Sequence, residues 1–164
     1  MTKSAAQGDA HDQFVVAMMN YGGKGIKKNN EKAYKWLSKA ALQGHSRAQY
    51  YLGRMYRLGI GVGQSDIKAV NWWRKSAEQG NAPAQSNMGV MYHLGKGLEQ
   101  NSKKALEWLL KAAHQGNASA ACNIGYMYYH GQGIKKDTDK GIDWIKKAAE
   151  RGNKNAQSFL NGIN

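Results

Sequence analysis

The chain of 164 residues has little cysteine, proline or negative charge: one Cys, one Pro, and 11 acidic residues against 24 lysines and arginines. A single thiol, Cys122, excludes an internal disulfide and a cysteine-based zinc site. No run of apolar residues is long enough to span a bilayer, so we expect no membrane insertion. The composition therefore does not indicate a protein that is stabilised by disulfides or that spans a membrane.

The chain does contain a string that returns at a fixed interval. The segment KWLSKAALQGHSRAQYYLG from Lys35 recurs with substitutions from Asn71, Glu107 and Asp143. Four tryptophans mark a 36-residue period: Trp36, Trp72, Trp108 and Trp144. A period in the thirties is typical of stacked repeat proteins, in which one unit cannot bury its apolar face alone. We therefore predict one repeat domain over residues 1–164, consisting of the end of a preceding outer helix (1–7), four units (8–43, 44–79, 80–115, 116–151) and a terminal inner helix (152–164).

Each unit is predicted to hold two helices. In the second unit, Ala48, Leu52, Met55 and Tyr56 form an apolar stripe at helical spacing, which indicates the inner helix. Paired glycines end that helix, and a polar residue then caps the outer helix in each unit: Asn29, Ser65, Asn101 or Asp137. Alanines beside the repeated tryptophan predict closely packed helices with the indole buried between them.

The pattern A-x-x-x-L-G-x-M-Y-x-x-G-x-G-V, followed by D-x-x-K-A-x-x-W-W-x-K-A-A-x-Q-G, is matched best by residues 48–80. It resembles the Sel-one-like repeat family, which is related to the tetratricopeptide repeats. The resemblance implies an all-α, right-handed α/α superhelical solenoid of 36-residue helix-loop-helix repeats. It also implies an adaptor, often bacterial, that organises protein complexes, envelope processes or host interactions. The first unit departs from the pattern at Asp12, Ala17 and Asn20, as a terminal unit that faces water should.

The copies within the chain also predict a binding surface. Columns that agree between units hold the stack together, whereas columns that vary on an exposed stripe are free to recognise a partner. Inner helices line the concave wall of helical solenoids, tyrosine and arginine dominate binding energy at interfaces, and asparagine can bridge a peptide backbone. The predicted groove residues are Arg47, Tyr50, Tyr51, Arg54, Asn87, Val90, His93, Asn123, Tyr126 and Tyr129.

Apparent catalytic motifs have simpler interpretations. Ser65 and Lys68 fit the S-x-x-K pattern of penicillin-recognising serine enzymes, but Ser65 stands where an outer helix begins and is expected to cap it. The glycines of residues 59–63 follow no strand, as a phosphate-binding loop would require. The five histidines share no ligand spacing. We expect no catalytic residue, metal or cofactor.

The predicted function is a non-enzymatic scaffold that binds a protein or peptide on its groove. A net charge of +13 favours an acidic partner. Two alternatives stay open: an immunity protein that blocks a toxic effector, and nucleic-acid binding through the basic surface, which no recognisable nucleic-acid module supports. We favour a monomer, and the compartment is open between the bacterial periplasm or exterior and the cytoplasm.

Overall fold

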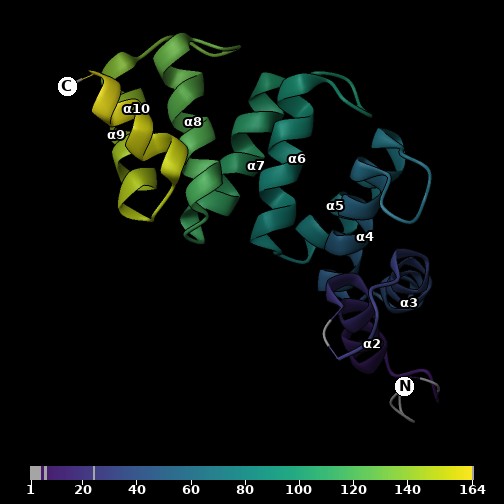
Figure 1. Ribbon diagram of the computed structural model, residues 1–164. Helices are drawn as coiled ribbons and strands as arrows, with labels where there is room; N and C mark the ends of the chain where they lie inside the picture. The colour runs from purple at the N-terminus through teal and green to yellow at the C-terminus, as the bar shows by residue number, and fades with distance from the viewer. Residues whose placement is uncertain (1–4, 6, 24, 164) are drawn as a thin grey trace. The chain divides into compact units, whose positions relative to one another are not determined.

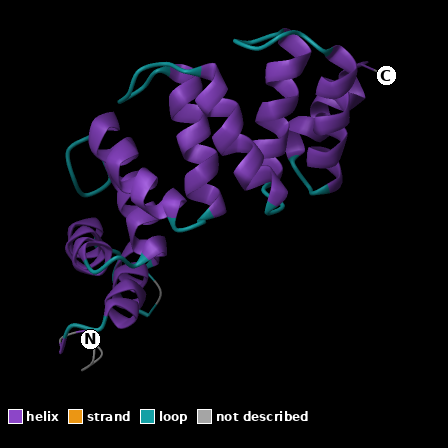
Figure 2. Ribbon diagram, turned by 180° about the vertical axis from the view of Figure 1, so that it is seen from behind, coloured by secondary structure: helices purple, strands orange, loops and turns teal. Residues whose placement is uncertain are grey.

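The computed structural model describes residues 5, 7–23 and 25–163, and the regular structure in these ranges is entirely α-helical (Figures 1 and 2). The helices are α2 (Ala10–Gly22), α3 (Asn30–Leu42), α4 (Ser46–Leu58), α5 (Asp66–Glu78), α6 (Ala82–Leu94), α7 (Ser102–His114), α8 (Ala118–His130), α9 (Thr138–Glu150) and α10 (Lys154–Ile163). Even-numbered helices are the predicted inner helices, and odd-numbered ones are the outer helices. The all-α helical-repeat fold is thereby confirmed. The predicted end of a preceding helix over residues 1–7 lies largely outside the described residues.

The chain forms two compact units, residues 1–81 and 82–164. In the first, α2 packs against α3 and α4 against α5, while α3 also contacts α4. In the second, α6 packs against α7 and α8 against α9, and α10 closes the unit against α9. Helix pairs joined by short loops are therefore the building element of each unit. The continuity of a single repeat domain stays a prediction.

The ends of the helices follow the predicted signals. The side chains of Asn29, Ser65, Asn101 and Asp137 each accept a hydrogen bond from the backbone N–H three residues later. Ser65 is thus a helix cap, as predicted, with its Oγ 3.3 Å from the Lys68 nitrogen. Gly44 follows the end of α3 with φ of 87°, a left-handed conformation that glycine adopts without a steric cost.

The repeated tryptophan is not the buried residue of the outer helix, and this prediction was wrong. The fully or nearly buried position is the next one along, which holds Leu37, Trp73, Leu109 and Ile145. Trp36 and its three equivalents are only partly buried, and a lysine ammonium lies over each ring, as for Lys39 Nζ at 4.8 Å from the Trp36 centroid. One residue corresponds to about 100° around a helix, so the core face selects the position beside the tryptophan.

Glycines in the inner helices allow the two helices of a pair to approach closely. A Cβ at Gly89 would lie 2.5 Å from Leu109 Cγ, and one at Gly53 would lie 2.5 Å from the Trp73 ring. An aromatic ring occupies this position at Gly53, whereas the aliphatic side chains of Leu109 and Ile145 occupy it at Gly89 and Gly125.

A buried glutamine joins three consecutive helices in the first unit. Gln49 on α4 is 4% exposed, and its Nε2 donates to the Ala41 carbonyl of α3 at 3.1 Å. Its Oε1 accepts from Gln79 Nε2, at the end of α5, at 2.7 Å. The next repeat keeps the glutamine pair, with Gln115 Nε2 donating to Gln85 Oε1 at 2.7 Å. In the repeat after that, the equivalent of Gln49 is Ala121, and Arg151 Nη1 donates directly to the Ala113 carbonyl at 3.0 Å. The carbonyls of Ala41 and Ala113 stand at equivalent positions of the repeat, and they accept hydrogen bonds from different side-chain donors.

Candidate functional site

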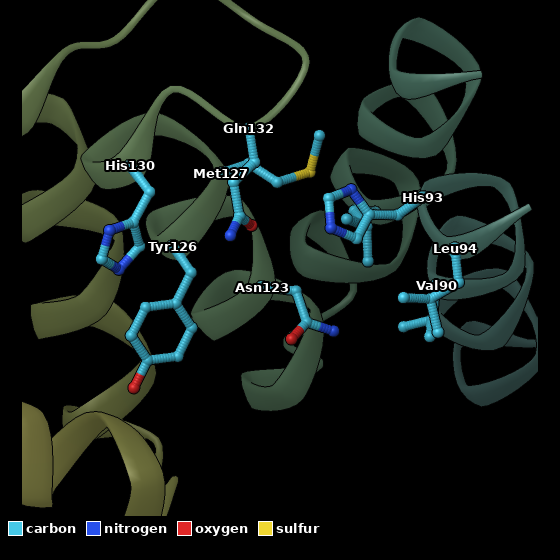
Figure 3. A pocket seen from close by; sticks show the side chains of 9 residues that line it. Val90, His93, Leu94, Asn123, Tyr126, Met127, His130 and Gln132 are labelled. Carbon is cyan, nitrogen blue, oxygen red and sulfur yellow. The ribbon is translucent and has the colours of Figure 1, made fainter. Parts of the chain in front are cut away.

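A pocket of about 390 Å³ lies in the second unit between α6 and α8. Figure 3 shows the side chains of Val90, His93 and Leu94 on one side of it and those of Tyr126 and His130 on the other. The residues that line it are Val90, His93, Leu94, Leu109, Asn123, Tyr126, Met127, His130 and Gln132. Its volume is in the range of sites that hold a small ligand or one large side chain.

The floor of the pocket is apolar because the core reaches its surface here. Leu109 on α7 is 1% exposed and still lines the pocket, since Gly89 on α6 leaves room for its side chain. Met127 on α8 is also buried and contributes to the floor. The amides of Asn123 and Gln132 and the two imidazoles add hydrogen-bonding groups. An apolar floor with a few convergent polar groups is suited to binding an apolar side chain and the backbone beside it.

His93 contributes a polar atom that is not satisfied by the surrounding protein. Its Nδ1 is buried and has no hydrogen-bond partner among the described residues. The His93 backbone carbonyl, in contrast, accepts from Gln100 Nε2 at 2.7 Å, which ties the loop after α6 to this position. Buried polar atoms in folded proteins are nearly always paired, so this nitrogen is available to a bound group.

Aromatic packing holds the α8 wall of the pocket in place. The Tyr126 ring stacks on His130 at 6.2 Å and meets Phe159 of α10 edge-on at 5.4 Å. Burial raises the pKa of Tyr126, and the neighbouring Cys122 adds to that increase. Burial likewise raises the pKa of the Cys122 thiol, so the cysteine stays protonated near neutral pH and is a poor nucleophile.

The first unit carries a different surface on α4, with arginines and aromatic rings in contact. Arg54 lies 6.0 Å from the Tyr50 centroid and 5.8 Å from that of Tyr51, and Arg47 lies 5.0 Å from the Phe14 ring of α2. The Tyr51 ring is 5.9 Å from Phe14. We call Arg47, Tyr50, Tyr51 and Arg54 the α4 surface.

Eight of the ten predicted groove residues fall into two groups, and the other two, Asn87 and Tyr129, belong to neither. Val90, His93, Asn123 and Tyr126 come together in the pocket of the second unit. Arg47, Tyr50, Tyr51 and Arg54 come together on the α4 surface of the first unit. Asn87 and Tyr129 do not line the pocket; the Tyr129 ring packs against Phe159 at 5.0 Å.

Sequence reasoning did not select five of the residues that line the pocket: Leu94, Leu109, Met127, His130 and Gln132. Leu109 and Met127 stand in the columns of the buried residues Leu37 and Met55, and the pattern alone does not show that Gly89 exposes Leu109 to the pocket. Leu94 and His130 stand one turn after Val90 and Tyr126 on the same variable stripe of their helices, but they were not among the predicted groove residues.

Within the described ranges, no three side chains of the His, Cys, Asp or Glu type gather in a way that could hold a metal ion. The same part of the chain has no helix that is both long and apolar enough to cross a bilayer.

A family model, described as the Sel1 repeat, matches four successive segments, residues 10–45, 46–81, 82–117 and 118–153. The chain belongs to the Sel1 repeat family. Proteins with Sel1 repeats are generally helical scaffolds for protein interaction, and protein partners are what the family suggests for this chain. No curated protein matches this chain.

Solved Sel1 repeat structures share the fold. A Sel1 repeat protein of Oxalobacter formigenes is 33% identical with a TM-score of 0.90, over 97% of this chain and 65% of that one. A protective antigen of uropathogenic Escherichia coli with an SLR fold is 35% identical with a TM-score of 0.90, over 96% of this chain and 34% of that one. The Helicobacter pylori cysteine-rich protein B shares the fold at 18% identity and a TM-score of 0.64, over 80% of this chain and 97% of that one. This chain therefore spans less than two thirds of the first two relatives.

Proposed function

We propose that this Sel1 repeat chain is a non-enzymatic scaffold that captures a partner protein or peptide by one large apolar side chain in the pocket of the second unit. The observation that carries the proposal is the apolar floor formed by Leu109 and Met127 beneath polar groups on both helices. Anchor side chains that fill such pockets supply most of the binding energy at protein interfaces.

The polar groups around the pocket give the partner's backbone a place to bind. Asn123 is partly buried on α8 and can both donate and accept. The unpaired Nδ1 of His93 can form a further hydrogen bond when a partner supplies the matching group. These contacts would fix the direction of a bound segment, while the apolar anchor supplies affinity.

The relatives support a bacterial setting for this scaffold. The two solved structures at 33% and 35% identity are bacterial, and one of them is a protective antigen of a pathogenic strain. An interaction role in virulence or at the cell envelope is the setting we propose for this chain.

The pocket is tested by selecting displayed random peptides on the purified protein and measuring the affinity of the enriched peptides by fluorescence anisotropy. We expect a consensus with one large apolar residue. Val90→Trp, which fills the pocket, should weaken binding about tenfold or more, because losing one buried anchor costs about 2 kcal/mol. His114→Trp adds the same side chain at an exposed position on α7 and should leave the affinity unchanged.

Tyr126→Ala opens the α8 wall and provides a second variant if Val90→Trp does not fold, as judged by circular dichroism. Enrichment of peptides with no apolar consensus would contradict the proposal. So would a folded variant that binds as tightly as the unmodified protein.

A further inference from the structure

The α4 surface of the first unit has a regular arrangement of charge and rings. Arg47, Tyr51 and Arg54 are spaced by four and three residues, so they lie on one face of α4 with the tyrosine between the two arginines. Two helical turns separate the arginines by about 10 Å along the helix axis. Tyr51 is only partly buried, as are Tyr50 and Arg54, and Arg47 is exposed.

Both guanidinium groups are oriented by aromatic rings. Arg47 lies over Phe14, and Arg54 lies near both Tyr50 and Tyr51. Tyr51 is itself held by Phe14 at 5.9 Å and, edge-on, by Tyr21 at 6.0 Å. Contacts of this kind hold a guanidinium in place without neutralising its charge.

Among the described residues of the unit, no carboxylate neutralises the charge of these two arginines. The ion pair that the described residues form joins Arg57 to Asp66 at 3.4 Å, and neither Arg47 nor Arg54 has a carboxylate partner in the same ranges. The nearby Asp9 carboxylate caps α2 through the Asp12 N–H at 2.8 Å. The rings of His45 and His11 lie 5.9 Å apart on this side of α2 and α4.

From this arrangement we infer that the α4 surface binds an acidic, proline-containing segment of a partner protein in the polyproline II conformation. This inference rests on the proposed scaffold function and names the chemistry of the partner at a second site. A polyproline II helix has three residues per turn and rises about 3.1 Å per residue, so residues i and i+3 lie on one side about 9 Å apart. Two glutamates at that spacing match the two arginines, and a proline between them can pack on the Tyr51 ring, because aromatic surfaces recognise this conformation.

Synthetic peptides separate specific recognition from general attraction of negative charge. A fluorescein-labelled peptide with Glu-Pro-Pro-Glu at its centre is compared with Gln-Pro-Pro-Gln and with an isomer in which the two glutamates are adjacent. We expect the first to bind most tightly to the full chain at low ionic strength. Arg47→Gln and Arg54→Gln should each weaken its binding about three- to tenfold, as measured by fluorescence anisotropy.

Matched variants identify the source of any loss. Arg74→Gln removes the same charge from an exposed position on α5 and should change the affinity less than about twofold. Arg54→Lys keeps the charge without the planar fork, and we expect an intermediate loss. Val90→Trp in the second unit should leave the binding of this peptide unchanged, so failure of the pocket and failure of the α4 surface give different results.

Three outcomes would overturn the inference. One is equal affinity for the two isomers with different glutamate spacing. Another is an equal loss with Arg74→Gln, which would show that only the overall field of the protein acts. The third is a single-stranded oligonucleotide of equal charge that displaces the peptide and binds more tightly than it does, which would assign the surface to nucleic acid.

Discussion

At the start of α4, a histidine occupies a position that asparagine or aspartate fills at other inner helices. His45 Nδ1 accepts a hydrogen bond from the Ala48 N–H at 3.2 Å, where Asn117, Asn153 and Asp9 use a side-chain oxygen. Burial lowers the pKa of His45, and the positive charges of His11 and Arg47 lower it further, although Asp9 opposes them. The neutral imidazole is therefore the form that caps the helix.

Acidification should weaken the first unit through this residue. Since the pKa of His45 is lower in the folded than in the unfolded chain, the unfolded chain binds more protons, and stability falls as the pH drops below about 6.5. His45→Asn keeps a cap that does not titrate and should make the thermal midpoint less dependent on pH over this range. On acidification, the unmodified protein should lose more unfolding free energy than His45→Asn does, and the difference between the two losses should approach the value of one helix cap, about 1 kcal/mol. An identical pH dependence of the two proteins in thermal unfolding followed by circular dichroism would show that His45 plays no such role.

The roles of some residues could be predicted from the sequence, and those of others could not. Asn29, Ser65, Asn101 and Asp137 were predictable as caps because a cap depends on local spacing and a side-chain acceptor. The burial of Leu37 rather than Trp36 was not, because two neighbouring large residues differ only in their angle around the helix, and the partner helix decides which one faces the core. A repeated residue is thus not necessarily a buried one.

At the scale of the element, the glutamine contacts determine how one helix pair meets the next. Gln49 connects α3, α4 and α5 through a carbonyl and an amide, and both of its bonds are buried or partly buried. The second unit keeps a glutamine pair at Gln85 and Gln115, but its last full repeat has Ala121 and Arg151 instead, and the Arg151 guanidinium reaches the Ala113 carbonyl. The chain itself therefore contains two solutions to the same packing problem.

This comparison predicts a loss and its rescue. Gln49→Ala removes the side-chain donor of the Ala41 carbonyl, which keeps the Gly44 N–H at 3.1 Å. It also removes one of two acceptors of the Gln79 amide, which keeps the Lys75 carbonyl at 3.2 Å, so the free energy of unfolding should fall by about 1 kcal/mol. The double variant Gln49→Ala with Gln79→Arg recreates the pair seen at Ala121 and Arg151 and should recover at least part of that loss. Urea unfolding of the three proteins measures both effects. A double variant no more stable than the single one would mean that the arginine arrangement depends on other features of the second unit.

The helices were more predictable than the pocket because the signals that define a helix lie within its own sequence. Periodicity, glycines and caps act within one helix, and they gave the helix-loop-helix order of the repeats. The pocket depends on three helices at once, because its floor includes Leu109 of α7, which reaches it past Gly89 of α6 toward α8. The variable stripe and the columns beside it predicted Val90, His93, Asn123 and Tyr126, but they could not predict which core residues would be open to these side chains.

At the scale of the whole molecule, positive charge is the dominant property. The net charge is +13, and the ion pairing found in the described ranges is Arg57 with Asp66. Several lysines lie over aromatic rings instead, such as Lys75 over Trp72 at 4.7 Å and Lys111 over Trp108 at 4.5 Å. These contacts place the ammonium groups without cancelling their charge, so mutual repulsion remains in the folded state.

Added sodium chloride should therefore stabilise the fold while it weakens binding of an acidic peptide. Screening of like charges is expected to raise the thermal midpoint by about 2–4 °C for each 1 kcal/mol of repulsion removed. Differential scanning calorimetry across a range of ionic strength tests the stability, and anisotropy with the Glu-Pro-Pro-Glu peptide tests the binding in the same buffers. A thermal midpoint that stays constant or falls would mean that self-repulsion does not limit the stability of this protein.

The exchange of Gln49 and Gln79 for Ala121 and Arg151 also limits how these repeats can be recombined. The partners are 30 residues apart in the chain, one on an inner helix and the other at the end of the following outer helix. A chimaera joined in the loop between them would combine the alanine of one copy with the glutamine of another, and the carbonyl would lose its side-chain donor while keeping the backbone N–H of the following glycine. Grafts joined at the glycine that precedes each inner helix move both partners together, which makes Gly44 and Gly116 the natural junctions for building longer or shorter arrays from this chain.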